Sequence, residues 1–323
     1  MKTHEGPRPA EEIHAIIDDL RGKYVPLARD VAFRSCLDRL LRCDADGNQI
    51  SKPVEFTSTG ETRGIAVFGG AGSGKTSLVH RTVGRHPALQ PTDAALRPCV
   101  SITVPNPATM KSVGLEILKA TGYPGSSDRR QTAWQIWTDV RTRFEVLGTI
   151  VLIIDEAHDL FPKPSKSEAP DILKTFKSLM QGDGAVIVIL SGISSLWHNI
   201  SFDDQVDRRF CKFELPPVAT SADRKLVWGL LCHYSARAGI ERPDQADLVE
   251  RLAHAARHRL GLCIEQIINA IECALMRGDT KLDVQHFADG FFRQEGCTVA
   301  DNVFLAPRWS SIDLVGKGAT PTR

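Results

Sequence analysis

The apolar positions at the start of the chain recur at the spacing of a helix. Two such groups fall within residues 8–43, and each would line one helix face: Ile13, Ile16, Ile17 and Leu20, then Cys36, Leu37, Leu40 and Leu41. The stretch that follows, residues 44–62, is polar and contains two glycines and a proline. We therefore predict an N-terminal helical arm and linker over residues 1–56.

From residue 63 to residue 217 the pattern changes to short apolar runs that alternate with helical stretches. Five runs read as strands, namely residues 64–68, 99–104, 149–154, 185–190 and 211–215. Continuous apolar runs suit strands that are buried on both faces of a parallel sheet. We therefore predict an α/β domain over residues 57–218, with a parallel five-stranded sheet flanked by helices.

After residue 217 the chain carries no further strand signal. Four helices are predicted, over residues 221–239, 245–258, 262–277 and 283–294, and they would form a small α-helical domain over residues 219–296. The tail, residues 297–323, is rich in serine, proline and glycine. We expect this tail to be mobile unless a partner orders it.

The composition is that of a globular protein, with 42% hydrophobic and 24% charged residues. A net charge of +1 neither requires nor excludes nucleic acid. No run approaches the roughly 20 apolar residues that span a bilayer, and the start lacks the apolar block of a secretory signal, so we expect a cytoplasmic protein without membrane contact. The eight cysteines include no Cys-x-x-Cys pair, which argues against a zinc site.

The strongest chemical signal is the run Gly-Gly-Ala-Gly-Ser-Gly-Lys-Thr at residues 69–76, between a predicted strand and a predicted helix. It matches the phosphate-loop pattern G-x-x-x-x-G-K-[ST] at every fixed position. Glycines let backbone N–H groups turn toward phosphates, and the helix N-terminus adds a favourable dipole. The predicted ATP-binding residues are Gly69, Gly70, Ala71, Gly72, Ser73, Gly74, Lys75, Thr76 and Ser77, with Lys75 at the β- and γ-phosphates and the Thr76 hydroxyl on Mg²⁺.

The second signal is the pair Asp155-Glu156 at the end of an apolar strand. A carboxylate in that place can hold Mg²⁺, so Asp155 is the predicted metal-side residue. Glu156 is placed to polarise the attacking water as a general base. The same residues begin the Asp-Glu-Ala-His box of some helicases, but those enzymes need a second RecA-like domain, and the remaining chain looks helical.

The order of these motifs resembles that of AAA+ ATPases: a phosphate loop, an Asp-Glu strand, a strand ending near Ser191, an arginine pair and a helical lid. More narrowly, the chain resembles the TniB/TnsC-type ATPases that regulate DNA transposition. That likeness covers roughly residues 10–295 and rests on an arm with Tyr24 and Arg34, Ile-Ala-Val-Phe-Gly at 65–69, Val-Pro-Asn-Pro at 104–107 and Ile-Ile-Asp-Glu-Ala-His at 153–158.

The resemblance implies further roles. Ser191 matches the place of a polar sensor that reads the γ-phosphate, although a strand-capping serine is the alternative. Arg208 and Arg209 lie where AAA+ proteins carry an arginine finger, which completes the neighbouring subunit's site. The sequence leaves open which of the two arginines acts.

One family feature is missing from the lid. Many AAA+ proteins place an arginine shortly after a glycine of a late helix, but Gly261 is followed by leucine, cysteine and isoleucine. Arg257 and Arg259 precede this glycine and could substitute.

The resemblance also implies contacts with double-stranded DNA, because family members assemble around a duplex and hold its backbone with residues after the second strand. The matching residues here are Thr109, Lys111, Lys119, Arg129 and Arg130. Cationic and hydroxyl groups suit phosphate contacts that do not read sequence. For each of them, a solvated helix face is an equal alternative.

Three other patterns have simpler interpretations. The acidic run at residues 44–48 resembles a calcium loop but lacks its glycine, and we interpret it as a polar turn. His254 and His258 lack a third metal ligand. Trp134 and Trp137 belong to a helical stripe that we interpret as core rather than as a stacking surface.

The leading hypothesis is an ATP-dependent regulator of DNA transposition that forms a homo-oligomeric ring or filament on DNA. It would recruit a transposase, with or without a target-selection protein, and slow ATP hydrolysis would switch it off. The alternatives are a secretion-system assembly ATPase, which usually adds a membrane segment, and a replication initiator or helicase loader, which commonly adds a DNA-binding domain. A scaffold without turnover is disfavoured by Glu156.

Overall fold

The computed structural model describes residues 8–123, 131–161, 169–201, 203–219, 221–244 and 247–314. Contacts between Cα atoms divide the chain into two compact units. The sheet unit comprises Leu27–Gly70 and Gly74–Leu215, and the helical unit comprises Met1–Pro26, Ala71–Ser73 and Pro216–Arg323. None of the described helices is long and apolar enough to cross a membrane.

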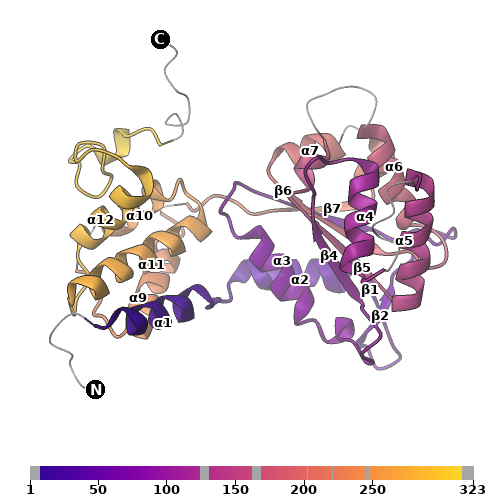
Figure 1. The fold of residues 1–323 in the computed structure, drawn as a ribbon, viewed down its shortest axis with the longest axis horizontal. Helices are drawn as coiled ribbons and strands as arrows, with labels where there is room; N and C mark the ends of the chain where they lie inside the picture. Colours follow the sequence, from indigo (N-terminus) through magenta and orange to yellow (C-terminus); the bar gives the residue numbers. More distant parts are fainter. Residues whose placement is uncertain are drawn as a thin grey trace, which may run out of the picture. The chain divides into compact units, whose positions relative to one another are not determined.

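The sheet unit is built on five parallel strands, as predicted (Figure 1). The strands are β3 (Gly64–Phe68), β4 (Cys99–Thr103), β5 (Val151–Asp155), β6 (Ile187–Gly192) and β7 (Phe210–Glu214), in the spatial order β4-β5-β6-β3-β7. Three of them, β3, β5 and β6, are buried at every residue, which explains their unbroken apolar sequences. Strand β3 lies between β6 and β7, although β4 and β5 follow it in the chain. The chain therefore runs from β3 to one side of this strand and later crosses to the other side, and in open α/β sheets ligands bind beside such a point.

Helices cover both faces of this sheet (Figure 1). Alternate residues of β3 lie in two separate cores, one on each face of the sheet. Ile65 and Val67 pack with α2 (Ala28–Asp38) and α3 (Lys75–Gly84), whereas Ala66 belongs to the opposite core. The opposite core is completed by α4 (Met110–Ala120), α5 (Ala133–Leu147), α6 (Ala169–Leu179) and the short α7 (Ser195–Ile200) and α8 (Asp204–Asp207). The predicted fold class, an α/β parallel sheet between helices, is confirmed.

The predicted N-terminal arm is two helices that pack in different units. Helix α1 (Ala10–Arg21) buries Ile13, Ile17 and Leu20 and contacts helices of the helical unit. Helix α2 buries Phe33 and Leu37 in the core of the sheet unit. The spacing of apolar residues predicted helices in this arm, but it could not show that the two helices pack in different units.

A hairpin that we did not predict begins inside the arm and extends into the polar stretch. The helical assignment of Leu40 and Leu41 is wrong, because α2 ends at Asp38 and Leu41 lies in a strand. Strands β1 (Leu41–Cys43) and β2 (Gln49–Pro53) pair antiparallel around a turn at Asp44. The Asp44 side chain accepts hydrogen bonds from the backbone N–H groups of Asp46 and Asn48, at 3.0 and 2.9 Å. The hairpin is mostly exposed, so its residues lack the alternation that marks a half-buried strand.

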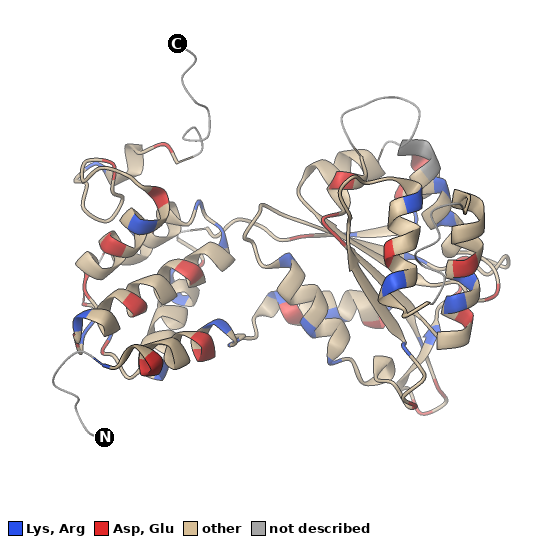
Figure 2. Cartoon of the chain, in the orientation of Figure 1, with Lys and Arg blue, Asp and Glu red and all other residues tan. Residues whose placement is uncertain are grey.

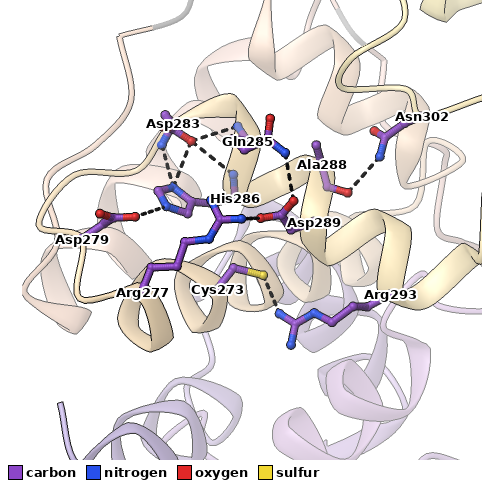
Figure 3. A network of polar contacts seen from close by, with 10 residues as sticks. All are labelled: Cys273, Arg277, Asp279, Asp283, Gln285, His286, Ala288, Asp289, Arg293 and Asn302. Carbon is purple, nitrogen blue, oxygen red and sulfur yellow. Dashed lines mark hydrogen bonds and ion pairs between the residues drawn. The ribbon is translucent and has the colours of Figure 1, made fainter. Parts of the chain in front are cut away.

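The helical unit contains the four helices expected after residue 217. They are α9 (Arg224–Ala238), α10 (Leu248–Ala255), α11 (Leu260–Arg277) and α12 (Val284–Glu295). Asp283 caps α12, because its carboxylate accepts from the N–H groups of Gln285 and His286 (Figure 3). The backbone N–H of Asp283 donates to Nδ1 of the buried His286 at 3.0 Å, so Nε2 carries the proton and donates to Asp279 at 2.8 Å.

The expectation of a mobile tail is wrong for residues 297–314, which pack on the helical unit. Phe304 is 2% exposed, and its ring centroid lies 5.4 Å from that of Phe287 and 5.8 Å from that of Phe291. Arg251 donates hydrogen bonds to the carbonyls of Val303, Phe304 and Ala306 at 2.8 to 3.1 Å. The prediction rested on the serine and proline content of this segment and overlooked the few apolar residues that pack on the helices. Residues 315–323 lie outside the described chain.

Replacement of Phe304 tests this packing. We expect Phe304→Ala to lower the free energy of unfolding of the helical unit by about 3–5 kcal/mol, because it removes a fully buried ring. Val299, in the same segment, is 70% exposed, so Val299→Ala should change that free energy by no more than about 0.5 kcal/mol. Denaturant titration followed by circular dichroism measures both, and equally small effects would contradict the packing of the tail.

Candidate nucleotide-binding site

The predicted phosphate loop connects the end of β3 to the start of α3. Gly72 and Gly74 have φ angles of 78° and 87°, which L side chains rarely adopt. Helix α3 begins at Lys75, directly after this turn. The N–H groups of its first turn have no partner within the helix, so they are available to an anion at the loop.

Lys75 is buried at the foot of this loop, with 7% of the residue exposed. Its ammonium donates hydrogen bonds to the carbonyl oxygens of Gly69 at 3.0 Å and Gly70 at 3.1 Å. These bonds offset the desolvation of the charge and hold the amine across the loop. The cation thus lies beside the backbone that the motif assigns to phosphate.

The Thr76 hydroxyl donates a hydrogen bond to Oδ2 of Asp155 at 2.7 Å, although the two residues are 79 positions apart in the sequence. The other carboxylate oxygen, Oδ1, accepts from the backbone N–H of Glu156 at 3.0 Å. A hydroxyl and a carboxylate oxygen in contact are ligands that Mg²⁺ prefers, so this pair fits the ion that the fold implies. Among the described residues no group of three or more acidic, His or Cys side chains forms a metal site, so a metal here would need further oxygens from water or a ligand.

Glu156 leaves the strand in the left-handed region, with φ 54° and ψ 35°. Its side chain is 48% exposed, and Oε2 lies 3.3 Å from Nδ1 of His158. The short helix η2 (Ala157–Leu160) that follows packs closely on the end of β6, because a Cβ on Gly192 would come within 3.2 Å of the His158 backbone nitrogen. The turn therefore directs the Glu156 carboxylate away from the sheet into an accessible position.

Ser191 lies inside β6, one residue before its end, opposite Val67 of β3. It is 1% exposed, and its hydroxyl has no hydrogen-bond partner among the residues that the structure describes. A buried hydroxyl without a partner costs about 1–3 kcal/mol. Such a group beside the phosphate-loop strand suits a residue that would bind a ligand oxygen.

The two predicted arginines lie between α8 and β7 and have different surroundings. Arg209 is 1% exposed and donates a hydrogen bond to the buried carboxylate of Glu61. The Arg208 side chain is 63% exposed, and its Nη2 lies 3.4 Å from the same Glu61 oxygen. Arg209 is therefore held inside its own protomer, whereas Arg208 is accessible to another molecule. Sequence reasoning missed Glu61, because a single acidic residue in a polar stretch carries no motif.

Over residues 48–220, more than half of its length, the chain matches the family described as "Bacterial TniB protein". The chain belongs to the TniB family. No curated protein matches it.

The fold of this TniB-family protein is that of AAA+ ATPases of the ORC/Cdc6 type. It is similar to the Cdc6p protein of Pyrobaculum aerophilum, with a TM-score of 0.62, 15% identity and coverage of 89% of this chain and 75% of that one. It is similar also to Aeropyrum pernix ORC1, solved in complex with DNA, with a TM-score of 0.58, 18% identity and coverage of 85% and 68%. Aeropyrum pernix ORC2, solved in ADPNP–ADP complexes, gives a TM-score of 0.59, 15% identity and coverage of 88% and 75%. At these identities the likeness shows the fold alone.

Three of the five predicted DNA residues of the TniB-family protein lie at α4. Thr109 caps this helix, its hydroxyl accepting from the Ser112 N–H at 3.0 Å, and Lys111 lies in the first turn. Lys119 lies eight residues further on, about 12 Å along the axis, and pairs with Glu116 at 3.3 Å. The structure thus brings Thr109 and Lys111 together but not Lys119, while Arg129 and Arg130 lie outside the described residues. Figure 2 shows basic and acidic residues interspersed on α4 and α5.

The structure corrects one core assignment and explains the histidine pair. Trp137 is 8% exposed and donates from Nε1 to the Met110 carbonyl at 3.0 Å, whereas Trp134 is 75% exposed, so our assignment of Trp134 to the core is wrong. Trp134 lies in the first turn of α5 and is not among the residues that this helix buries. His254 and His258 contact the carbonyls of Ile312 and Val218, at 2.9 and 3.0 Å.

The ion pair between Arg209 and Glu61 should make stability depend on pH. The hydrogen bond from Arg209 holds the pKa of Glu61 below its ordinary value of 4.5. A lowered pKa in the folded state stabilises the protein above the ordinary value, and this contribution is lost as pH falls through the lower one. We expect the unsubstituted protein to lose more unfolding free energy between about pH 6 and about pH 3 than Glu61→Gln does.

Denaturant titrations at the two pH values measure this difference. The matched control is Glu55→Gln, because Glu55 pairs with Arg42 at 2.9 Å with both side chains exposed. Its loss on acidification should equal that of the unsubstituted protein. An equal loss in Glu61→Gln would show that the buried pair does not contribute.

Proposed function

We propose that this TniB-family protein is an ATP-hydrolysing regulator of DNA transposition, assembled by ATP on double-stranded DNA. The observation that carries the proposal is the contact of Thr76 with Asp155 beside the phosphate loop. A loop glycine pattern alone can arise in other turns. A buried lysine across that loop and a hydroxyl–carboxylate pair at its end together suit a nucleoside triphosphate with its metal ion.

Each residue of this site has a task that follows from its surroundings. Lys75 would turn from the carbonyls of Gly69 and Gly70 toward the β- and γ-phosphate oxygens. Thr76 and Asp155 would hold Mg²⁺, which supplies charge neutralisation when bound. Glu156, accessible beside them, would accept the proton of the attacking water, and the unpartnered Ser191 hydroxyl would donate to the γ-phosphate.

Arg208 is the arginine that we assign to the neighbouring subunit's site. Its side chain is exposed and its contact with the buried Glu61 is long, at 3.4 Å, so Arg208 can exchange that partner for a phosphate. Arg209 would instead keep the segment before β7 in place. A site completed by a second protomer makes bound ATP a link between subunits, and hydrolysis removes the link.

DNA binding is supported by the family and by the groups at the start of α4. Aeropyrum pernix ORC1 and Drosophila ORC, which share the fold, were solved with DNA. Thr109 and Lys111 would contact the phosphate backbone without reading sequence, with Lys119, Arg129 and Arg130 as further candidates. The assembled ring or filament would then recruit the transposase and a target-selection protein.

Replication initiation or helicase loading is the second candidate, because the ORC and Cdc6 proteins share this fold at TM-scores of 0.55 to 0.62. Membership of the TniB family favours transposition. The two functions differ in the partner that is recruited, a transposase or a helicase, so the partner captured on the DNA-bound assembly distinguishes them.

Electron microscopy of the protein on duplex DNA tests the assembly. We expect rings or filaments with a non-hydrolysable ATP analogue and none with ADP. Glu156→Gln should retain such assemblies with MgATP itself, because removal of the base stops hydrolysis after binding. Lys75→Ala should form none. The proposed control of assembly by ATP would be refuted if Glu156→Gln formed no assemblies with MgATP. It would also be refuted if the unsubstituted protein did not bind duplex DNA with any nucleotide.

Mixed variants test whether Arg208 acts between protomers. Arg208→Ala and Lys75→Ala should each lose nearly all ATPase activity, since an arginine finger is worth about a thousandfold or more in turnover. An equal mixture of these two variants should recover about a quarter of the activity of the unsubstituted protein. Random pairing of protomers joins an intact phosphate loop to an intact Arg208 at about one site in four. A mixture of Lys75→Ala with the double variant is the control and should stay inactive. Recovery in the control, or none in the test mixture, would exclude a role in trans.

A further inference from the structure

The phosphate loop is in contact with an arginine that no motif assigns to it. Arg29 lies in the first turn of α2, and its guanidinium packs against Gly74. A Cβ built on Gly74 would lie 2.9 Å from Nη2, 3.8 Å from Cζ and 3.9 Å from Nη1 of Arg29. The guanidinium therefore occupies the space that the missing side chain of Gly74 leaves, one residue before Lys75.

The position of Arg29 is fixed by the packing of its helix. Phe33 and Leu37 of α2 are fully buried in the same core as Leu78 and Val79 of α3. The Phe33 ring also lies edge-on to Phe213, with centroids 5.2 Å apart. Because α2 is packed against the helix that begins at the phosphate loop, Arg29 cannot move far from the loop without disrupting this core.

The electrostatics of this arrangement favour an anion. Arg29 is the second residue of α2, and the dipole of a helix disfavours a cation in its first turn. The loop beside it already carries the buried Lys75 ammonium and the N-terminus of α3. Two cationic side chains and the first turn of α3 thus adjoin one short loop, and this combination suits a polyanion.

We propose that Arg29 is a further phosphate-binding residue of this site, recognising the polyphosphate of a nucleoside di- or triphosphate bound to its own protomer. The proposal rests on the proposed function in that it needs a nucleotide at the phosphate loop. A guanidinium suits the task, because its planar fork donates two parallel hydrogen bonds to phosphate oxygens.

Equilibrium binding of MgATP and MgADP to the full chain tests the assignment. Arg29→Ala should weaken both by about tenfold or more, as for loss of a charge-assisted hydrogen bond, while Arg29→Lys should retain part of the affinity. The matched control is Arg39→Ala, which removes an exposed arginine at the opposite end of the same helix and should change affinity less than about twofold. The melting temperature without nucleotide, measured in parallel, reports any purely structural effect.

The outcomes separate this inference from the function on which it rests. Nucleotide binding that depends on Lys75 but is equal in Arg29→Ala and Arg39→Ala would overturn the assignment of Arg29 alone. A lower melting temperature in Arg29→Ala with unchanged affinity would do the same, since it would reduce the contact to packing against Gly74. Failure of the unsubstituted protein to bind MgATP would overturn the proposed function and this inference together.

Discussion

The arrangement of the site depends on the parallel order of the sheet around β3. All five strands end at the same edge, and β3 lies between β6 and β7. The loop after β3, the Asp155-Glu156 pair at the end of β5 and Ser191 near the end of β6 therefore meet at one edge. The hydrogen bond between Thr76 and Asp155 spans 79 residues of sequence, and it forms because the sheet register aligns the ends of these strands.

The rigidity of that edge comes from burial on both sides of β3. Ile65 and Val67 face one core and Ala66 faces the other, so the strand before the phosphate loop cannot shift without disturbing both. Gly64 shows how closely the neighbouring strands approach, since a Cβ there would lie 2.3 Å from the Val188 carbonyl oxygen. A site that needs fixed backbone donors benefits from this constraint, because the loop geometry is set by packing and not by the ligand alone.

The sequence predicted the features that depend on neighbouring residues and missed those that depend on contacts between residues far apart in the chain. The phosphate loop, the five strands and the lid helices are local patterns, and each was recognisable from spacing or from an apolar run. The pair of Glu61 with Arg209 joins residues 148 positions apart, and the contact of Arg29 with Gly74 depends on how α2 packs. Exposure is equally non-local, which is why Trp134 was assigned to the core and Phe304 to a mobile tail.

The two adjacent arginines show how burial can separate the roles of neighbouring residues. Loss of Arg209 would leave the Glu61 carboxylate buried without its partner, and breaking a buried pair in this way typically costs about 3–5 kcal/mol. The Arg208 side chain is 63% exposed and its contact with Glu61 is long, at 3.4 Å, so this contact is weaker than that of Arg209. The same carboxylate thus anchors the backbone through one arginine while leaving the next free to change partners. The two neighbouring arginines of the segment before β7 therefore differ in how firmly the fold holds their side chains.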